Sequence, residues 1–89
     1  MTSSDHACTL SATTAPAGSL VFSIKNQGKK VTEFYVYAED GVRVVGEVEN
    51  IGPGLSGEVV VHAPAGTYHT ACKPGMLGKG IRATFTVEK

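Results

Sequence analysis

The sequence predicts an all-β fold, a Greek-key β-sandwich of about seven short strands. β-Branched residues and a two-residue alternation of apolar and polar side chains dominate the chain, and no helical period appears. Gly and Pro interrupt this pattern at short intervals, as is typical of sandwiches. The expected strands cover residues 8–12, 19–25, 31–38, 42–48, 57–62, 67–72 and 81–87.

The first three strands follow from alternation and turn residues. The first alternates, and a turn at residues 15–18 leads into the second. Leu20, Phe22 and Ile24 occupy every second position of the second strand, so they share one face. An Asn-Gln-Gly turn at residues 26–29 then opens the third strand, which is rich in Phe and Tyr.

Turn signals also separate the later strands. The Glu-Asp-Gly sequence at residues 39–41 indicates a tight hairpin between the third and fourth strands. The Gly-Pro-Gly sequence at residues 52–54 breaks the chain before the fifth strand, and residues 63–66 turn it into the sixth. A longer Gly-rich loop, residues 73–80, precedes the last strand, and function concentrates in loops of this kind.

The length indicates a single domain, residues 1–89. The chain starts almost directly on a strand and ends directly after one, and its first five residues lack the features of a signal peptide. We interpret it as a domain cut from a longer exported protein, with Met1 added for expression.

Charge and motifs exclude several functional classes. With 8 basic and 8 acidic residues the net charge is zero, which argues against nucleic acid as a partner. No apolar run approaches the ~20 residues needed to span a bilayer, so we expect no direct membrane insertion. Neither a nucleophile–His–acid constellation nor a phosphate-binding Gly-rich loop is present, so we expect no enzyme.

The two cysteines, Cys8 and Cys72, leave two alternatives open. In an oxidising compartment a disulfide between the first strand and the penultimate one would stabilise a small sandwich by about 4 kcal/mol. Alternatively, one or both thiolates bind a soft or borderline metal. Their spacing does not choose between the two.

Residues 66–76, Gly-Thr-Tyr-His-Thr-Ala-Cys-Lys-Pro-Gly-Met, resemble the copper loop of cupredoxins. In that family a Gly-x-Tyr strand delivers a Cys, and Pro-Gly-His follows. Upstream, Ala17-Gly18, Asn26-Gln27-Gly28 and the stretch before Phe34 match the family's order and spacing. The resemblance covers nearly the whole chain and implies a cupredoxin-like sandwich.

The departures from this pattern concern the metal ligands. A blue-copper site needs two His, a Cys and a weak axial Met. Here Thr32 or Glu33 takes the first His position, Met76 the second, and Ile81 the axial Met position. Only Cys72 remains in place, so we expect no unmodified electron-transfer copper site.

A narrower resemblance, to the cupredoxin domain of the EfeO family of periplasmic iron-uptake proteins, accounts for these substitutions. It is carried by Asp5-His6-Ala7-Cys8, by Thr32-Glu33-Phe34, by residues 41–54 with their Glu-Asn-Ile-Gly-Pro-Gly element, and by residues 66–72. The resemblance implies a periplasmic location, an attached helical imelysin-like (M75 peptidase-like) domain and a membrane iron permease system. It also implies that Cys8, Glu33 and Cys72 form or border a nonstandard site for copper or iron.

Three further residues are candidate metal ligands, each with a structural alternative. Met76 supplies a thioether near Cys72 or packs over the core. His69 faces away from Cys72 by alternation, which favours a surface role, although strand twist can bring its imidazole closer. Glu49 is the best member of an oxygen-donor cluster suited to Fe³⁺, whose carboxylates are otherwise simply solvated. The other members of the cluster are Glu39, Asp40 and Glu47.

Two functions remain as hypotheses. The first is a metal-binding accessory domain for iron uptake, with copper or iron as cargo or cofactor. Such a domain would bind iron, oxidise ferrous iron, or pass electrons or ions to the attached helical domain, and the sequence does not choose among these roles. The second is a non-metal interaction module, fixed by a Cys8–Cys72 disulfide, that docks a partner domain. His6 and His62 are given no role in either.

Overall fold

The computed structural model describes residues 2–3, 8–10, 14–76 and 80–89, which form nine strands and one short 3-10 turn. Within these ranges no helix has the length and apolarity needed to cross a membrane. The elements are β1 (Thr2–Ser3), β2 (Cys8–Thr9), β3 (Thr14–Pro16), β4 (Gly18–Asn26), β5 (Thr32–Tyr37), β6 (Val44–Ile51), β7 (Ser56–Ala63), β8 (Gly66–Cys72), η1 (Pro74–Met76) and β9 (Ile81–Glu88).

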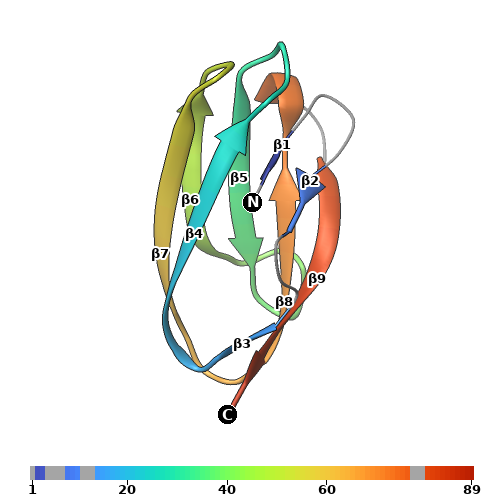
Figure 1. The fold of residues 1–89 in the computed structure, drawn as a ribbon. Coiled ribbons are helices and arrows are strands. Elements are labelled where there is room, and N and C mark those ends of the chain that lie inside the picture. Colours follow the sequence, from blue (N-terminus) through green and yellow to red (C-terminus); the bar gives the residue numbers. More distant parts are fainter. Residues whose placement is uncertain (1, 4–7, 11–13, 77–79) are drawn as a thin grey trace.

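The strands build two mixed sheets that pack face to face (Figure 1). One has the order β2-β1-β4-β7 and the other the order β3-β9-β8-β5-β6. Neighbouring strands are antiparallel except for the pairs β1–β4 and β3–β9, which are parallel. The predicted all-β sandwich is therefore confirmed.

Both sheets contribute to one apolar core. Phe22 of β4 contacts Phe34 of β5 and Phe85 of β9, with ring centroids 5.5 and 5.2 Å apart. Ile24 lies two residues after Phe22 and is fully buried, so the alternation along β4 points into the core as predicted. Burying a side chain of this size contributes about 1.5–3 kcal/mol, so these aromatic and aliphatic residues hold the two layers together.

Two glycines allow the sheets to close tightly along the edge formed by β6 and β7. A Cβ atom at Gly46 would lie 2.7 Å from a methyl group of Val61. A Cβ atom at Gly57 would lie 2.9 Å from a methyl group of Val48. Because any larger residue would force these layers apart, the close approach of the edges depends on glycine at both positions.

Asn26 ties together the loops at the end of the sandwich where β4 ends. Its side chain is 1% exposed and donates hydrogen bonds to the carbonyl oxygens of Lys30 and Ile51, both at 2.8 Å. The side-chain oxygen accepts a bond from the backbone N–H of Gly28. Backbone groups that would otherwise be buried without partners are thus satisfied, which fixes the start of β5.

The structure differs from the predicted elements at the N-terminal end. Residues 15–18 were predicted as a turn, but Thr14–Pro16 form β3, which pairs with β9. β1 has no predicted counterpart. Of the predicted strand 8–12, β2 covers Cys8–Thr9, and residues 11–12 lie outside the described residues. Strands this short depend on distant partners, and local alternation does not reveal them.

Candidate metal centre

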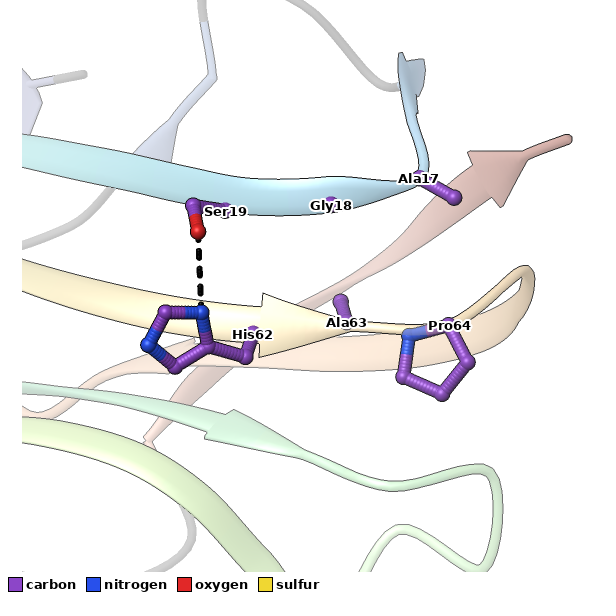
Figure 2. A pocket seen from close by; sticks show the side chains of 6 residues that line it. All are labelled: Ala17, Gly18, Ser19, His62, Ala63 and Pro64. Carbon is purple, nitrogen blue, oxygen red and sulfur yellow. Dashed lines mark hydrogen bonds between the residues drawn. The ribbon is translucent and has the colours of Figure 1, made fainter.

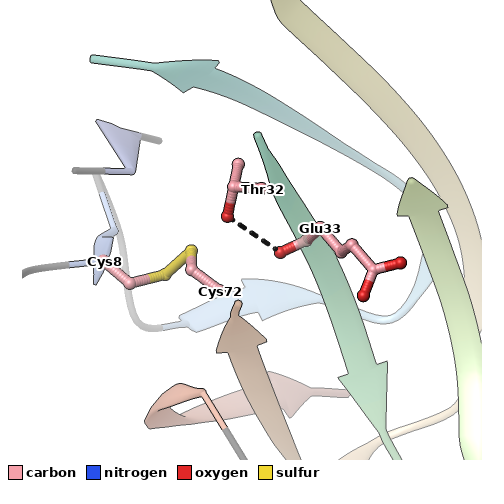
Figure 3. Close-up of a disulfide and its surroundings, with 4 residues drawn as sticks. All are labelled: Cys8, Thr32, Glu33 and Cys72. Atoms are coloured by element: carbon pink, nitrogen blue, oxygen red, sulfur yellow. Dashed lines mark hydrogen bonds between the residues drawn. A yellow bond between two sulfur atoms is a disulfide. The ribbon is translucent and has the colours of Figure 1, made fainter. Parts of the chain in front are cut away.

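A disulfide joins Cys8 of β2 to Cys72 at the end of β8. The Cα atoms are 5.8 Å apart, and the bond links the four-stranded sheet to the five-stranded one (Figure 3). Cys72 is fully buried in the core, whereas Cys8 is partly exposed. Of the two alternatives for the cysteines, the structure contains the disulfide.

Glu33 directly precedes the residue that pairs with Cys72, but its carboxylate lies on the face of the sheet opposite the disulfide. Thr32 and Phe34, its neighbours on β5, are buried on the core side, and Phe34 pairs with Cys72. Figure 3 shows the Glu33 side chain extending away from the sulfur atoms. The backbone carbonyl of Glu33 accepts a 2.8 Å hydrogen bond from the N–H of Lys73, which joins the start of β5 to the end of β8.

On the outer face of the five-stranded sheet, Glu33 belongs to a group of acidic side chains around Tyr35. Burial, together with the repulsion of a phenolate by the carboxylates of Glu33, Glu47 and Glu49, raises the pKa of Tyr35 to about 12. Glu33 also makes a side-chain hydrogen bond with Tyr35. The ammonium of Lys73 lies 4.4 Å from the centre of the Tyr35 ring, within the range of a cation–π contact.

A β-bulge in β6 brings Glu49 opposite Glu33. Thr32 pairs with Ile51 and Phe34 with Val48, so two residues of β6 stand opposite the single residue Glu33. The second of these, Asn50, adopts the left-handed conformation with φ of 56°. An Asn tolerates this conformation better than most residues do, which explains its use at the bulge.

The remaining predicted ligands lie elsewhere. His69 lies in the middle of β8, three residues before Cys72, and its Nε2 lies 3.2 Å from the carbonyl oxygen of Glu39. Met76 ends the turn η1, and its side chain lies outside what the structure describes. Asp40 accepts backbone hydrogen bonds from Arg43 and Val42, which lower the pKa of its carboxyl. Asp40 thus fixes the hairpin rather than joining Glu49.

The structure therefore brings the two cysteines together and separates them from the carboxylates. In the part of the chain that the structure describes, no three His, Cys, Asp or Glu side chains form a group able to hold a metal ion. A blue-copper ligand set does not fit, because Thr32, Glu33 and Ile81 stand where its ligands would be. The two sulfur atoms fit a metal as a thiolate pair, which requires reduction of the disulfide.

Sequence reasoning missed Tyr35 and Lys73 as neighbours of the candidate site. The signal for Tyr35 was available, because residues i and i+2 of a strand share a face and Tyr35 follows Glu33 by two. Lys73 comes directly after a cysteine at a strand end, and only the pairing of β8 with β5 places its ammonium over the Tyr35 ring.

A separate depression of about 290 Å³ lies where β4 begins and β7 ends (Figure 2). His62 is its one titratable residue, and the His62 Nδ1 atom lies 2.9 Å from the Ser19 hydroxyl. None of the predicted ligands is among the described residues that line it. Its lining residues are Ala17, Gly18, Ser19, His62, Ala63 and Pro64.

The two-sheet topology and the sequence pattern define the class of this protein. The profile of the family described as "Cupredoxin-like domain" matches residues 1–87. The chain belongs to this family of cupredoxin-like domains. Among solved structures, it is similar to dithionite-reduced auracyanin from Roseiflexus castenholzii, with a TM-score of 0.68, 20% identity, and coverage of 85% of this chain and 82% of that one. This likeness shows the fold.

Within this family, the chain is similar in sequence to particular curated proteins. The chain is 36% identical over 89 residues to the iron uptake system component EfeO of Yersinia pestis, with 98% of this chain and 22% of the relative covered. It is 35% identical over 72 residues to the protein of the same name from Yersinia pseudotuberculosis serotype I, with coverage of 81% and 19%. The chain thus spans about a fifth of the length of the relatives it matches.

Proposed function

We propose that this chain is a metal-binding, non-catalytic accessory domain of a bacterial iron-uptake protein and works in the periplasm. The similarity to the EfeO proteins over almost the whole chain supports the role in iron uptake. The short coverage of those relatives supports an attached further domain. In this proposal that domain is helical and imelysin-like, and the complete protein serves a membrane iron permease.

The metal centre of this proposal is the sulfur pair in its reduced form. The observation that carries it is the direct contact of the Cys8 and Cys72 sulfur atoms at the end of β8. Cys72 holds the position of the cysteine ligand in the cupredoxin copper loop, and Cys8 supplies a second sulfur there. Two thiolates favour copper in its cuprous state or another soft or borderline ion.

Of the other candidate ligands, the proposal includes Met76 in the metal site and leaves out Glu33, Glu49 and His69. Met76, four residues after Cys72, is the proposed thioether ligand, a donor type that also suits cuprous copper. Glu33 and Glu49 lie on the outer face and do not reach the sulfur pair without rearrangement of β5. His69 is separated from the pair in the same way.

Metal titration before and after reduction tests this function. The reduced, desalted chain is titrated without oxygen with Cu⁺ held by a competing chelator, and separately with Fe³⁺. One-to-one Cu⁺ binding that is lost in Cys72→Ser and retained in Glu33→Gln is the expected result. Equal binding by the oxidised chain and the Cys72→Ser variant would contradict the sulfur site, and absence of binding in both redox states would contradict metal binding altogether.

The disulfide itself favours one alternative, a non-metal module that docks a partner domain. A bond between the first sheet and the second stabilises a small sandwich whether or not a metal ever binds. A gain of two hydrogens in mass on reduction, together with no metal affinity in either state, is the result expected for this alternative. The titration above therefore decides between the two functions.

A further inference from the structure

The two cysteines of the disulfide are unequally exposed. Cys72 is 0% exposed and belongs to the core cluster that includes Phe34 and Phe85. It ends β8, which has β5 and β9 on its two sides. Cys8 is partly exposed and lies on β2, the two-residue strand at the edge of the other sheet. An approaching reagent therefore meets Cys8 first.

We propose that the Cys8 sulfur is a thiol–disulfide exchange site, at which the thiolate of an external dithiol opens the bridge. A thiolate attacks a disulfide sulfur along the line of the S–S bond, from the side opposite the leaving sulfur. Access to the attacked sulfur is one of the factors that set the rate. Attack on Cys72 would require the reagent to enter from within the packed core, whereas attack on Cys8 starts at the surface of the sandwich.

The exchange proceeds in two balanced steps. In the first, the external thiolate forms a bond to the Cys8 sulfur, the S–S bond breaks, and its electron pair leaves on the Cys72 sulfur as a thiolate. In the second, the other thiolate of the reagent attacks its own sulfur in the mixed disulfide and releases the Cys8 thiolate. The dithiol loses two electrons and becomes a disulfide, and the domain gains two thiolates that take up protons from solvent.

The position of β2 explains why this opening is local. β2 pairs through only two residues with β1, which in turn pairs through two residues with β4. The buried residues of the core cluster come from the longer strands, and Cys8 packs against this cluster from the edge strand β2. Reduction therefore frees the attachment of Cys8 while Cys72 stays anchored in β8.

This inference deepens the proposed function by adding a regulation of the same site, and it rests on that function for its biological meaning. The sulfur pair becomes available as metal ligands only after exchange. A dithiol reductant in the same compartment would thus decide whether the domain binds metal. The exchange chemistry itself needs no metal.

Mapping the mixed disulfide tests the proposal. The folded, oxidised chain is incubated with glutathione as a monothiol probe, and the reaction is stopped with excess maleimide at several times. After proteolysis, mass spectrometry locates both labels. The same reaction in urea, where both sulfurs are exposed, provides the control. The expected result is glutathione on Cys8 and maleimide on Cys72, in about tenfold excess over the reverse arrangement.

Two results would overturn the proposal. One is glutathione distributed over Cys8 and Cys72 in the same ratio for the folded and the unfolded chain. The other is a folded chain that does not react at all while the unfolded chain does. Neither result depends on metal, so a failure here is distinguishable from a failure of the Cu⁺ titration, which uses chain already reduced.

Discussion

The carboxylate of Glu33 lies beside the hydroxyl of Tyr35, on the face of the five-stranded sheet opposite the Cys8–Cys72 disulfide. The alternation of β5 enforces this relationship, because Thr32 and Phe34 are directed into the core. The sulfur atoms and the carboxylate nearest to them along the chain are therefore separated by the thickness of a sheet.

The variant Glu33→Gln tests this contact through the pKa of Tyr35. Removing the negative charge eliminates one source of repulsion, so we expect the pKa of Tyr35 to fall from about 12, as measured by phenolate absorbance against pH. Glu58→Gln, on the other sheet, is the matched control and should leave it unchanged. An unchanged pKa in Glu33→Gln would contradict the contact.

The same pKa predicts a loss of stability at alkaline pH. Because the folded chain holds the pKa of Tyr35 above the ordinary value of 10.0, the neutral phenol contributes fully to stability below pH 10. We expect the contribution to disappear as pH rises from 10 to about 12. Urea unfolding at a series of pH values should show a smaller decline in Tyr35→Phe than in the unaltered chain.

The double variant Cys8→Ala, Cys72→Ala measures how much the disulfide contributes to the free energy of unfolding. The cysteines are 64 residues apart, and closing a loop of that length restricts the unfolded chain by about 4 kcal/mol. We expect the free energy of unfolding in urea to fall by roughly this amount. Stability equal to that of the oxidised chain would mean that the bridge does not hold the sandwich together.

Replacing Gly46 by Ala should separate the sheets along the β6–β7 edge. Its new Cβ atom would lie 2.7 Å from Val61, a core residue with a stiff branched side chain, and we expect a loss of about 1–3 kcal/mol. Gly52→Ala is the control, since its Cβ atom would meet only the tip of the exposed Leu55 side chain. Equal thermal shifts in the two variants would argue against close packing at Gly46.

Thr70→Val should stabilise the chain. Thr70 is fully buried on the core side of β8, and among the described residues its hydroxyl oxygen has no hydrogen-bond partner. Valine has nearly the same shape without a polar atom, so we expect a gain of about 1 kcal/mol in urea unfolding. Thr84→Val on the exposed face of β9 should change little. A loss of stability in Thr70→Val would mean that the hydroxyl has a partner.

Much of the fold was predictable from local pattern. The strands containing Phe22, Phe34 and Phe85 were placed correctly because alternation with period two is a direct consequence of strand geometry. The turns between them were marked by Gly, Pro and Asn residues. β1 and β3 were not predicted, because a strand of two or three residues exists only through its partner.

The candidate site was less predictable. Sequence alone located Cys72 at the end of a strand. It did not decide whether Cys8 and Cys72 form a disulfide or bind metal as thiolates. The sequence also predicts that the Glu33 side chain lies on the outer face of its sheet, because the next residue, Phe34, is a core residue. The resemblance to a copper-ligand position instead suggested that the Glu33 carboxylate binds metal. The neighbours of Tyr35 come from its own strand β5, from β6 and from the residue after β8, so no local pattern contained all of them.

The sequence by itself determined the strands, the faces of those strands and the family of the chain, because each depends on residue types at short, fixed spacings. Only the tertiary structure decided that Cys8 meets Cys72, that Glu33 lies on the opposite face, and that the short strands pair at all. These outcomes depend on where distant segments meet in space. Alternation fixes the face a side chain points to but carries no information about which distant residue lies there.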